Sequence, residues 1–250
     1  MEKKNIAVSH ALSTFSIVLI LVAWQLYSIK VNNPHLMPDP LDVFKQFFIL
    51  LGEAQTYIII LATFKRLLIT IALATAFGLT LGLLSGMHYQ LEALLKPIVI
   101  SLRTLPVISI IVIVLILYGN TFSLYIISFL LLFPLIYQSE LDGVKNIDPL
   151  LLDVLKLDCN KCSFNAIKMV FFPLSLPHLR TGILQSAGLG IKVLVVAEFI
   201  AQTKTSIGRE LYFNRISLEY SKVFAWTIIL ICIVVVIEHF VARYLKYTLK

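Results

Sequence analysis

Charged residues are scarce in this sequence. Of its 250 residues only 14% are Asp, Glu, Lys or Arg, whereas 59% are hydrophobic, and the mean hydropathy is +0.91. Soluble domains carry roughly 25% charged residues and a smaller apolar share. A soluble core cannot absorb this much apolar surface, so the composition excludes an ordinary soluble domain and predicts a chain that lies in lipid.

Cysteine is also scarce. Cys159, Cys162 and Cys232 are too few and too unevenly spaced for a disulfide framework. The first two form a Cys-x-x-Cys pair, but no second pair or nearby His completes four zinc ligands, and no thioredoxin-like pattern surrounds them. We interpret them as incidental thiols of a reducing cytoplasm.

Motifs for catalysis and for nucleotide binding are missing. The sequence has no Gly-x-x-x-x-Gly-Lys-Ser/Thr loop, so we expect no ATP bound to this chain. It has no His-x-x-x-His or carboxylate cluster that would indicate a metal ion or an acid/base pair. The net charge of +7 is spread between apolar runs rather than gathered with aromatics. This distribution is typical of contact with anionic lipid and argues against nucleic acid.

Long apolar runs are what the sequence does contain. A helix crosses a bilayer with about 17 to 25 such residues, and runs of this kind recur from end to end. The first follows Lys3 and Lys4, exceeds a cleavable signal sequence in length and lacks a cleavage site, so we expect a retained helix. The fold class predicted is an all-α integral membrane protein with one membrane domain over residues 1–250. The expected spans are residues 11–29, 67–87, 97–118, 122–137, 181–201 and 223–244.

The order of these spans predicts a topology. Six spans place both termini on one side, and the Lys and Arg bias of the connections puts that side in the cytoplasm. Gly119-Asn120-Thr121 leaves room for only a tight turn, so spans 97–118 and 122–137 should form a helical hairpin. The longest cytoplasmic connection is then residues 138–180.

This cytoplasmic connection should contain a short amphipathic helix. Asp148 is a good N-cap and Pro149 a good first helical residue. Asp153 and Lys156 are polar, while one face of the helix is apolar. Such a helix, projecting from a membrane domain, predicts a partner with a groove to receive it. The apolar face consists of Leu151, Val154, Leu155 and Leu157.

A series of short motifs gives the chain its resemblance to the permease subunits of ABC importers, specifically the class serving nitrate, sulfonates, taurine and thiamine precursors. The family's cytoplasmic Glu-Ala-Ala triplet is replaced by Asp153-Val154-Leu155, and its glycine by Cys159 or Asn160. We favour Asn160, because Asn tolerates a left-handed helix end. The other matching motifs are Leu102-Arg103-Thr104-Leu105-Pro106, Phe172-Pro173, Leu176-Pro177, Val195-Val196-Ala197-Glu198-Phe199 and Ser206-Ile207-Gly208.

The resemblance implies an assembly in the inner membrane. Two copies of this chain, or this chain and a relative, would form the pathway for a small, anionic solute. Two cytoplasmic ATPase subunits would bind ATP and Mg²⁺ and receive the amphipathic helix, and an external binding protein would deliver substrate. The residues implied in coupling are Asp148, Pro149, Leu151, Asp153, Val154, Leu155, Leu157 and Asn160.

Three ionisable residues inside or beside the spans are candidates for the pathway. Such groups are costly in lipid and indicate a lined cavity or a partner. Lys192 suits the passage of anions. For Glu198, structural hydrogen bonding and pathway lining are equally compatible with the sequence. Glu198 is six residues from Lys192, so the two side chains project from different faces of one helix and are not expected to pair. Arg103 either lines the inner mouth or extends to the membrane interface.

Two other classes of protein are weighed against the importer. An intramembrane enzyme would need paired catalytic residues at one depth, and the sequence shows none. An ion-coupled secondary transporter would also hold charges such as Lys192 and Glu198 inside the membrane. It would have no use for the helix at residues 148–157, because an ATP-independent carrier has no ATPase to dock.

Overall fold

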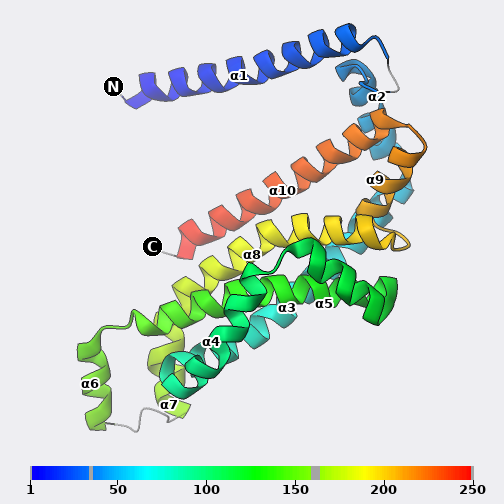
Figure 1. Cartoon of the computed structure of the whole chain (residues 1–250). Coiled ribbons are helices and arrows are strands. Elements are labelled where there is room, and N and C mark those ends of the chain that lie inside the picture. The colour runs from blue at the N-terminus through cyan, green and yellow to red at the C-terminus, as the bar shows by residue number, and fades with distance from the viewer. Residues whose placement is uncertain (1, 34–35, 159–163, 249–250) are drawn as a thin grey trace. The chain divides into compact units, whose positions relative to one another are not determined.

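The computed structural model describes residues 2–33, 36–158 and 164–248 (Figure 1). Every regular element in these ranges is a helix. The all-α class is therefore confirmed. In chain order the elements are α1 Glu2–Val31, α2 Pro40–Gly52, α3 Ala54–Met87, α4 Tyr89–Thr104, α5 Val107–Lys145, α6 Pro149–Asp158, α7 Phe164–Ala166, the π-helix η1 Ile167–Phe171, α8 Phe172–Ala201, α9 Ile207–Ile216 and α10 Tyr220–Thr248.

Within the described residues, five helical stretches are long and apolar enough to cross a membrane. They confirm an integral membrane protein. The expected span at residues 67–87 is the second part of a longer helix, α3, and the six-span count stays a prediction. The five stretches are Thr14–Val31, Ala54–Met87, Val107–Lys145, Ile167–Ala201 and Tyr220–His239.

The expected span at residues 97–118 is wrong as a single helix. Helix α4 ends at Thr104 and α5 begins at Val107, with Leu105 extended at φ −64° and ψ 136°. Pro106 causes the break, because it has no N–H to donate and its ring disfavours helical dihedral angles in the residue before it. Because the residues on both sides of Pro106 are apolar, the run resembles one continuous span in the sequence.

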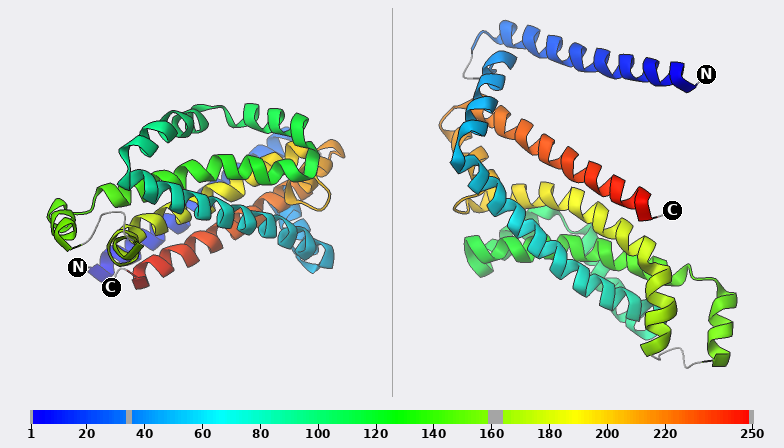
Figure 2. Two further views of the ribbon diagram at one scale, coloured as in Figure 1. Left: turned by 90° about the horizontal axis from the view of Figure 1, so that it is seen from below. Right: turned by 180° about the vertical axis from the view of Figure 1, so that it is seen from behind.

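The turn expected around residues 119–121 lies at Gly119. Its φ of +71° and ψ of −179° interrupt the helical dihedral angles of α5. Only glycine adopts this combination without strain, since a Cβ would clash with the backbone. The chain reverses there, and the second part of α5 runs back beside the first (Figures 1 and 2).

The chain divides into two compact units, Met1–Ile58 with Glu210–Ile231, and Ile59–Arg209 with Cys232–Lys250. In the first unit, the connection from α1 to α2 is held by side chains of α1. The Trp24 indole N–H donates to the carbonyl of Pro38 at 3.1 Å, and the Ser28 hydroxyl donates to the Asp39 carboxylate at 2.5 Å. Trp24 also stacks on Phe224, with ring centroids 5.4 Å apart. These contacts fix the start of α2.

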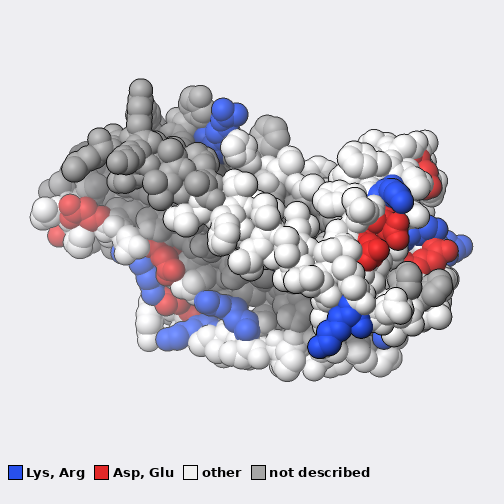
Figure 3. Space-filling model, turned by 90° about the horizontal axis from the view of Figure 1, so that it is seen from above, with Lys and Arg blue, Asp and Glu red and all other residues white. Residues whose placement is uncertain are grey.

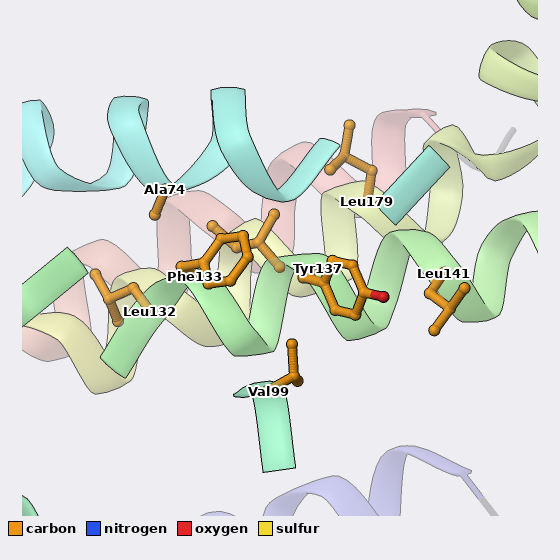
Figure 4. Packing of buried hydrophobic residues seen from close by; sticks show 8 residues of the cluster. Ala74, Val99, Leu132, Phe133, Tyr137, Leu141 and Leu179 are labelled. Atoms are coloured by element: carbon orange, nitrogen blue, oxygen red, sulfur yellow. The ribbon is translucent and has the colours of Figure 1, made fainter. Parts of the chain in front are cut away.

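In the second unit, the second half of α5 lies between α3 and α8 and forms the centre of the core. Figure 4 shows α5 side chains packed against Ala74 of α3, Val99 of α4 and Leu179 of α8. The phenyl rings of Phe129 and Phe133 stack with centroids 5.5 Å apart. The buried residues of this cluster are Ala74, Val99, Leu132, Phe133, Ile136, Tyr137, Leu141 and Leu179.

Glycines allow these helices to approach one another closely. A Cβ added to Gly78 of α3 would lie 2.8 Å from Ile136 Cγ2, and one added to Gly182 of α8 would lie 2.6 Å from Ser139 Cβ. Without a hydrophobic force between helices in lipid, such close contact is a main source of association. The glycine spacing visible in the sequence therefore marks both faces that pack on α5.

The surface agrees with a lipid environment. On the face drawn in Figure 3, most of the described atoms belong to uncharged residues. Large apolar side chains such as Ile116 and Leu68 are more than half exposed in the isolated chain. In water these surfaces would be costly, whereas acyl chains or neighbouring subunits cover them in a membrane.

We expect Gly82→Ala to destabilise the protein by about 1–3 kcal/mol, the usual cost of overpacking. The new Cβ would lie 2.8 Å from both the Tyr137 carbonyl oxygen and Glu140 Cβ. Thermal unfolding of the purified protein in detergent measures the effect. Gly52→Ala is the control, because nothing lies within 4 Å of its added Cβ. Equal melting temperatures for both variants would contradict the close packing of α3 on α5.

Candidate functional site

Helix α6 begins where the sequence predicts. The Asp148 carboxylate accepts a hydrogen bond from the Leu150 N–H at 2.9 Å, and its carbonyl accepts from the Leu151 N–H at 3.0 Å. Pro149 is the first residue of the helix. An aspartate cap followed by proline satisfies the free N–H groups of the first turn, so Asp148 and Pro149 position the helix and are confirmed in that role.

The leucines of α6 point in two directions. Leu150 and Leu151 are 73% and 49% exposed. Leu152 and Leu155 are partly buried against a cluster that contains Leu83 of α3. Leu155, which the sequence assigns to the face offered to a partner, is therefore partly covered by its own chain, and its role in coupling stays a prediction. The buried members of this cluster are Leu83, Val144, Ile147, Ala166 and Phe171.

The remaining predicted coupling residues lie in the second half of α6 or directly after it. Asp153 is exposed on α6. Val154 and Leu157 belong to the same helix, but their side chains lie outside the described part of the structure. Asn160 falls outside the described residues altogether, as do Cys159 and Cys162. The contribution of Asp153, Val154, Leu157 and Asn160 to coupling stays a prediction.

Glu198 lies in a buried ion pair. Its side chain is fully buried, and Arg66 Nη1 donates to Oε1 at 2.8 Å. The Thr63 hydroxyl lies 3.0 Å from both carboxylate oxygens, and the Gly208 N–H donates to Oε2 at 3.3 Å. A carboxylate with this many donors is compensated for the loss of water. Of the two roles that the sequence left open for Glu198, the geometry favours structural hydrogen bonding.

Arg66 extends the network to the loop between α8 and α9. Its guanidinium donates to the carbonyl of Thr205 at 3.2 Å and to that of Lys204 at 3.3 Å. This loop needs support, because Gln202 and Thr205 have φ values of +50° and +56°. Gly208 closes the junction, since a Cβ there would overlap the backbone of Phe199. Helices α3, α8 and α9 are therefore joined at one point.

Sequence reasoning missed Arg66. Arg66 directly precedes the expected span at residues 67–87, so the sequence assigns it to a connection, whereas it lies inside α3 with a side chain only 12% exposed. The signal was present: a carboxylate inside a span requires a cation at the same depth, and Arg66 is a basic residue in the first half of the long apolar helix α3. No spacing rule pairs residues 132 positions apart, so only the fold reveals the contact.

Lys192 lies on an exposed face of α8. Thr181 and Gln185 are exposed at helical spacing from Lys192. Leu189, which lies between Gln185 and Lys192 on the same face, is 42% exposed. Within the described residues Lys192 has no ion pair. An amine, an amide and a hydroxyl along one face of a spanning helix are unfavourable against acyl chains. This face therefore suits an aqueous pathway or a second protein subunit.

Arg103 lies in the last turn of α4, beside a cavity between α4 and α5. The cavity has a volume of 250 Å³ and also holds the ion pair of Lys145 with Glu92, whose Nζ and Oε1 are 2.5 Å apart. Arg103 is exposed, as expected for a residue at an inner mouth or an interface.

Among the described residues, no three His, Cys, Asp or Glu side chains are grouped so as to hold a metal ion.

We expect Arg66→Met to destabilise the protein by about 3–5 kcal/mol, because it leaves Glu198 buried without its cation. The double variant Arg66→Met with Glu198→Leu should be more stable than Arg66→Met alone, since both charges are then removed. Thermal unfolding in detergent of the two single variants and the double variant gives the coupling. Lys65→Met, an exposed neighbour on α3, is the control. Additive effects would contradict a direct Arg66–Glu198 interaction.

Known transport proteins resemble this chain over most of its length. The taurine transport system permease protein TauC of Escherichia coli is 24% identical over 75% of this chain and 70% of its own. The putative aliphatic sulfonates transport permease protein SsuC of Bacillus subtilis is 25% identical over 84% of this chain and 76% of its own. The formylaminopyrimidine transport permease protein ThiX of Halalkalibacterium halodurans is 24% identical over 81% and 79%.

A family profile gives the assignment. The profile described as binding-protein-dependent transport system inner membrane component matches residues 78–246, which is most of the chain and includes α4 to α9. The long apolar helices, the capped helix α6 and the relatives all agree with this match. The chain therefore belongs to the family of binding-protein-dependent transport system inner membrane components and is a multi-pass inner membrane permease of the ABC transporter type.

Proposed function

We propose that this chain is the permease subunit of an ABC importer that carries a small organic anion into the cytoplasm. Two permease subunits form the pathway, two separate ATPase subunits bind ATP and Mg²⁺, and an external protein delivers the substrate. The observation that carries the proposal is helix α6, a capped helix that presents exposed leucines beyond the end of α5. Such a helix has little use except to dock on a partner.

The coupling proposal rests on the two-sided packing of α6. Leu150 and Leu151 are available to a groove on an ATPase subunit, while Leu152 and Leu155 attach the helix to the membrane domain. A movement of the ATPase can therefore reach the ends of α3 and α5 through side-chain contact. Burial of one leucine contributes about 1.5–3 kcal/mol before the costs of association.

The proposal for the pathway rests on Lys192. Its amine lies on an exposed face of α8 together with Gln185 and Thr181, and it has no ion pair within the described residues. A second permease subunit facing this surface would enclose a polar channel between the two chains. A free cation in such a channel attracts anionic solutes and repels cations.

The substrate class is inferred from relatives and from this charge. Proteins named for taurine and for aliphatic sulfonates are among the relatives, and both names denote sulfonates. A third is named for formylaminopyrimidine, so the family accepts more than one chemistry. The free Lys192 amine favours an anion for this chain. The Lys and Arg bias of the connections supports a cytoplasmic position for both termini, and for α6 with them.

We expect Leu151→Asp to weaken the association with the ATPase about a hundredfold or more, because the groove loses an apolar contact and gains an unpaired charge. Co-purification of the ATPase from native membranes, with ATP hydrolysis by the complex, measures this. Leu218→Asp is the matched control, since Leu218 is 56% exposed in a loop at φ +59°, where Asp is well tolerated.

Normal ATPase recovery and transport for Leu151→Asp would contradict the coupling assignment. An ion-coupled carrier would then be the better interpretation. Saturable ATP hydrolysis by this polypeptide without partners would contradict the division of labour between subunits.

We expect Lys192→Glu to lower uptake of an anionic substrate at least about tenfold, because like charges in a narrow channel cost several kcal/mol. Lys192→Arg keeps the charge and should retain most uptake. Uptake into proteoliposomes is the measurement, and basal ATP hydrolysis reports on assembly. If Lys192→Glu transports as well as Lys192→Arg, Lys192 does not line the pathway.

A further inference from the structure

The cavity between α4 and α5 is rich in charged side chains. Lys96 and Arg103 of α4 line it, and so do Lys145 of α5 and a single carboxylate, Glu92. Glu92 is paired with Lys145. Three cations and one anion leave two positive charges, and neither Lys96 nor Arg103 has an ion pair within the described residues. The cavity is therefore cationic and lacks a counter-ion among the residues that the structure describes.

Helical spacing explains why these charges meet. Glu92, Lys96 and Arg103 are separated by four and seven residues and so share one face of α4. On α5, Leu141 and Lys145 follow Tyr137 at intervals of four residues and also share one face. The two faces enclose the cavity, with Val99 of α4 buried at its wall.

A second, independent observation is the hydroxyl of Tyr137. The side chain is 1% exposed and lines the cavity, and its hydroxyl lies beside the Ser85 hydroxyl of α3, although neither makes a hydrogen bond of full geometry with the described residues. A buried hydroxyl without a partner is costly, and native proteins usually satisfy such groups with a ligand or water. An oxyanion in the cavity would give this hydroxyl an acceptor.

The volume and walls restrict the occupant. At 250 Å³ the cavity is smaller than the roughly 300–1,000 Å³ of sites for drug-sized ligands. Val99, Ile100 and Leu141 provide apolar walls beside the cations. Arginine binds carboxylates, phosphates and sulfonates through two parallel N–H groups, and a tyrosine hydroxyl adds one more donor.

We propose that this cavity binds a small oxyanion, held by Arg103, Lys96 and the Tyr137 hydroxyl, with its short apolar part against Val99 and Leu141. Under the proposed function it is the position that the anionic group of the solute occupies near the inner end of the pathway, so this inference rests on that function. The phosphate of an anionic lipid has the same chemistry and is the other source of such a group.

The test uses the permease purified with its partner subunits and placed in nanodiscs of phosphatidylcholine. The probe is radiolabelled ethanesulfonate, an oxyanion with a short apolar part, and the readout is saturable binding. We expect Arg103→Gln to weaken binding about tenfold. Tyr137→Phe keeps the shape of the side chain and removes only the hydroxyl, so it should fold normally and weaken binding about fivefold.

Two further variants serve as controls. Lys45→Gln removes an exposed positive charge outside the cavity and should leave binding unchanged. Lys192→Gln identifies a different site: if it abolishes binding while Arg103→Gln and Tyr137→Phe do not affect it, the probe binds at Lys192 and the cavity proposal is overturned. Unchanged binding in all variants, or no saturable binding, overturns it as well.

A second set of nanodiscs containing phosphatidylglycerol distinguishes the two sources of oxyanion. Undiminished ethanesulfonate binding there assigns the cavity to the solute. Loss of ethanesulfonate binding, with retention of phosphatidylglycerol that depends on Arg103, supports the oxyanion site and assigns it to lipid. If the complex assembles and hydrolyses ATP normally but its cavity binds neither oxyanion, this inference alone is overturned and the proposed function stands.

Discussion

The close approach of α3 and α8 to α5 is the constraint on which the rest of the second unit depends. In lipid there is no hydrophobic driving force between apolar helices, so association depends on contact between complementary surfaces. Gly78, Gly82 and Gly86 of α3 provide one such surface, and Gly182 and Gly190 of α8 provide another. Both meet the second half of α5, whose side chains fill the space that the glycines leave.

This packing determines where charges can lie. Helices in close contact exclude water, and a carboxylate among them needs its donors at hand. Glu198 has Arg66, Thr63 and the Gly208 N–H, and the same guanidinium supports two loop carbonyls. Where the helices separate, between α4 and α5, cations remain without carboxylate partners. The buried Glu198 carboxylate is thus paired with a cation, whereas Lys96 and Arg103 beside the cavity have no ion pair among the described residues.

The sequence predicts local features well and long-range contacts poorly. Asp148 with Pro149 marks the start of α6, and Gly119 marks a turn, because both act through the backbone of neighbouring residues. The same local logic applied to Pro106 would have given the break there, but the apolar composition of the run led to the incorrect expectation of a continuous span over residues 97–118. Helix boundaries inside long apolar runs cannot be read from composition, since lipid does not penalise an extra apolar turn.

The candidate site shows the other limit. Lys192, Glu198 and Arg103 are conspicuous in the sequence because ionisable groups are rare in spans. The residues beside them are not conspicuous, since Arg66 is 132 residues from Glu198, and Lys96, which lines the same cavity as Arg103, looks like an ordinary interfacial lysine. Leu155 illustrates the same point for apolar residues: periodicity assigns it to a face, and only the cluster of Leu83 and Val144 shows which way that face turns.

The attachment of α6 has a mechanical consequence. Only Asn146, Ile147 and Asp148 separate it from α5, and Ile147 is itself buried in the cluster that Leu152 and Leu155 touch. A connection of this kind has low compliance, because it contains no glycine and its central residue cannot move without opening a cavity. Work done on the exposed leucines is therefore transferred to the membrane helices over a short distance, with little of it dissipated in a flexible joint.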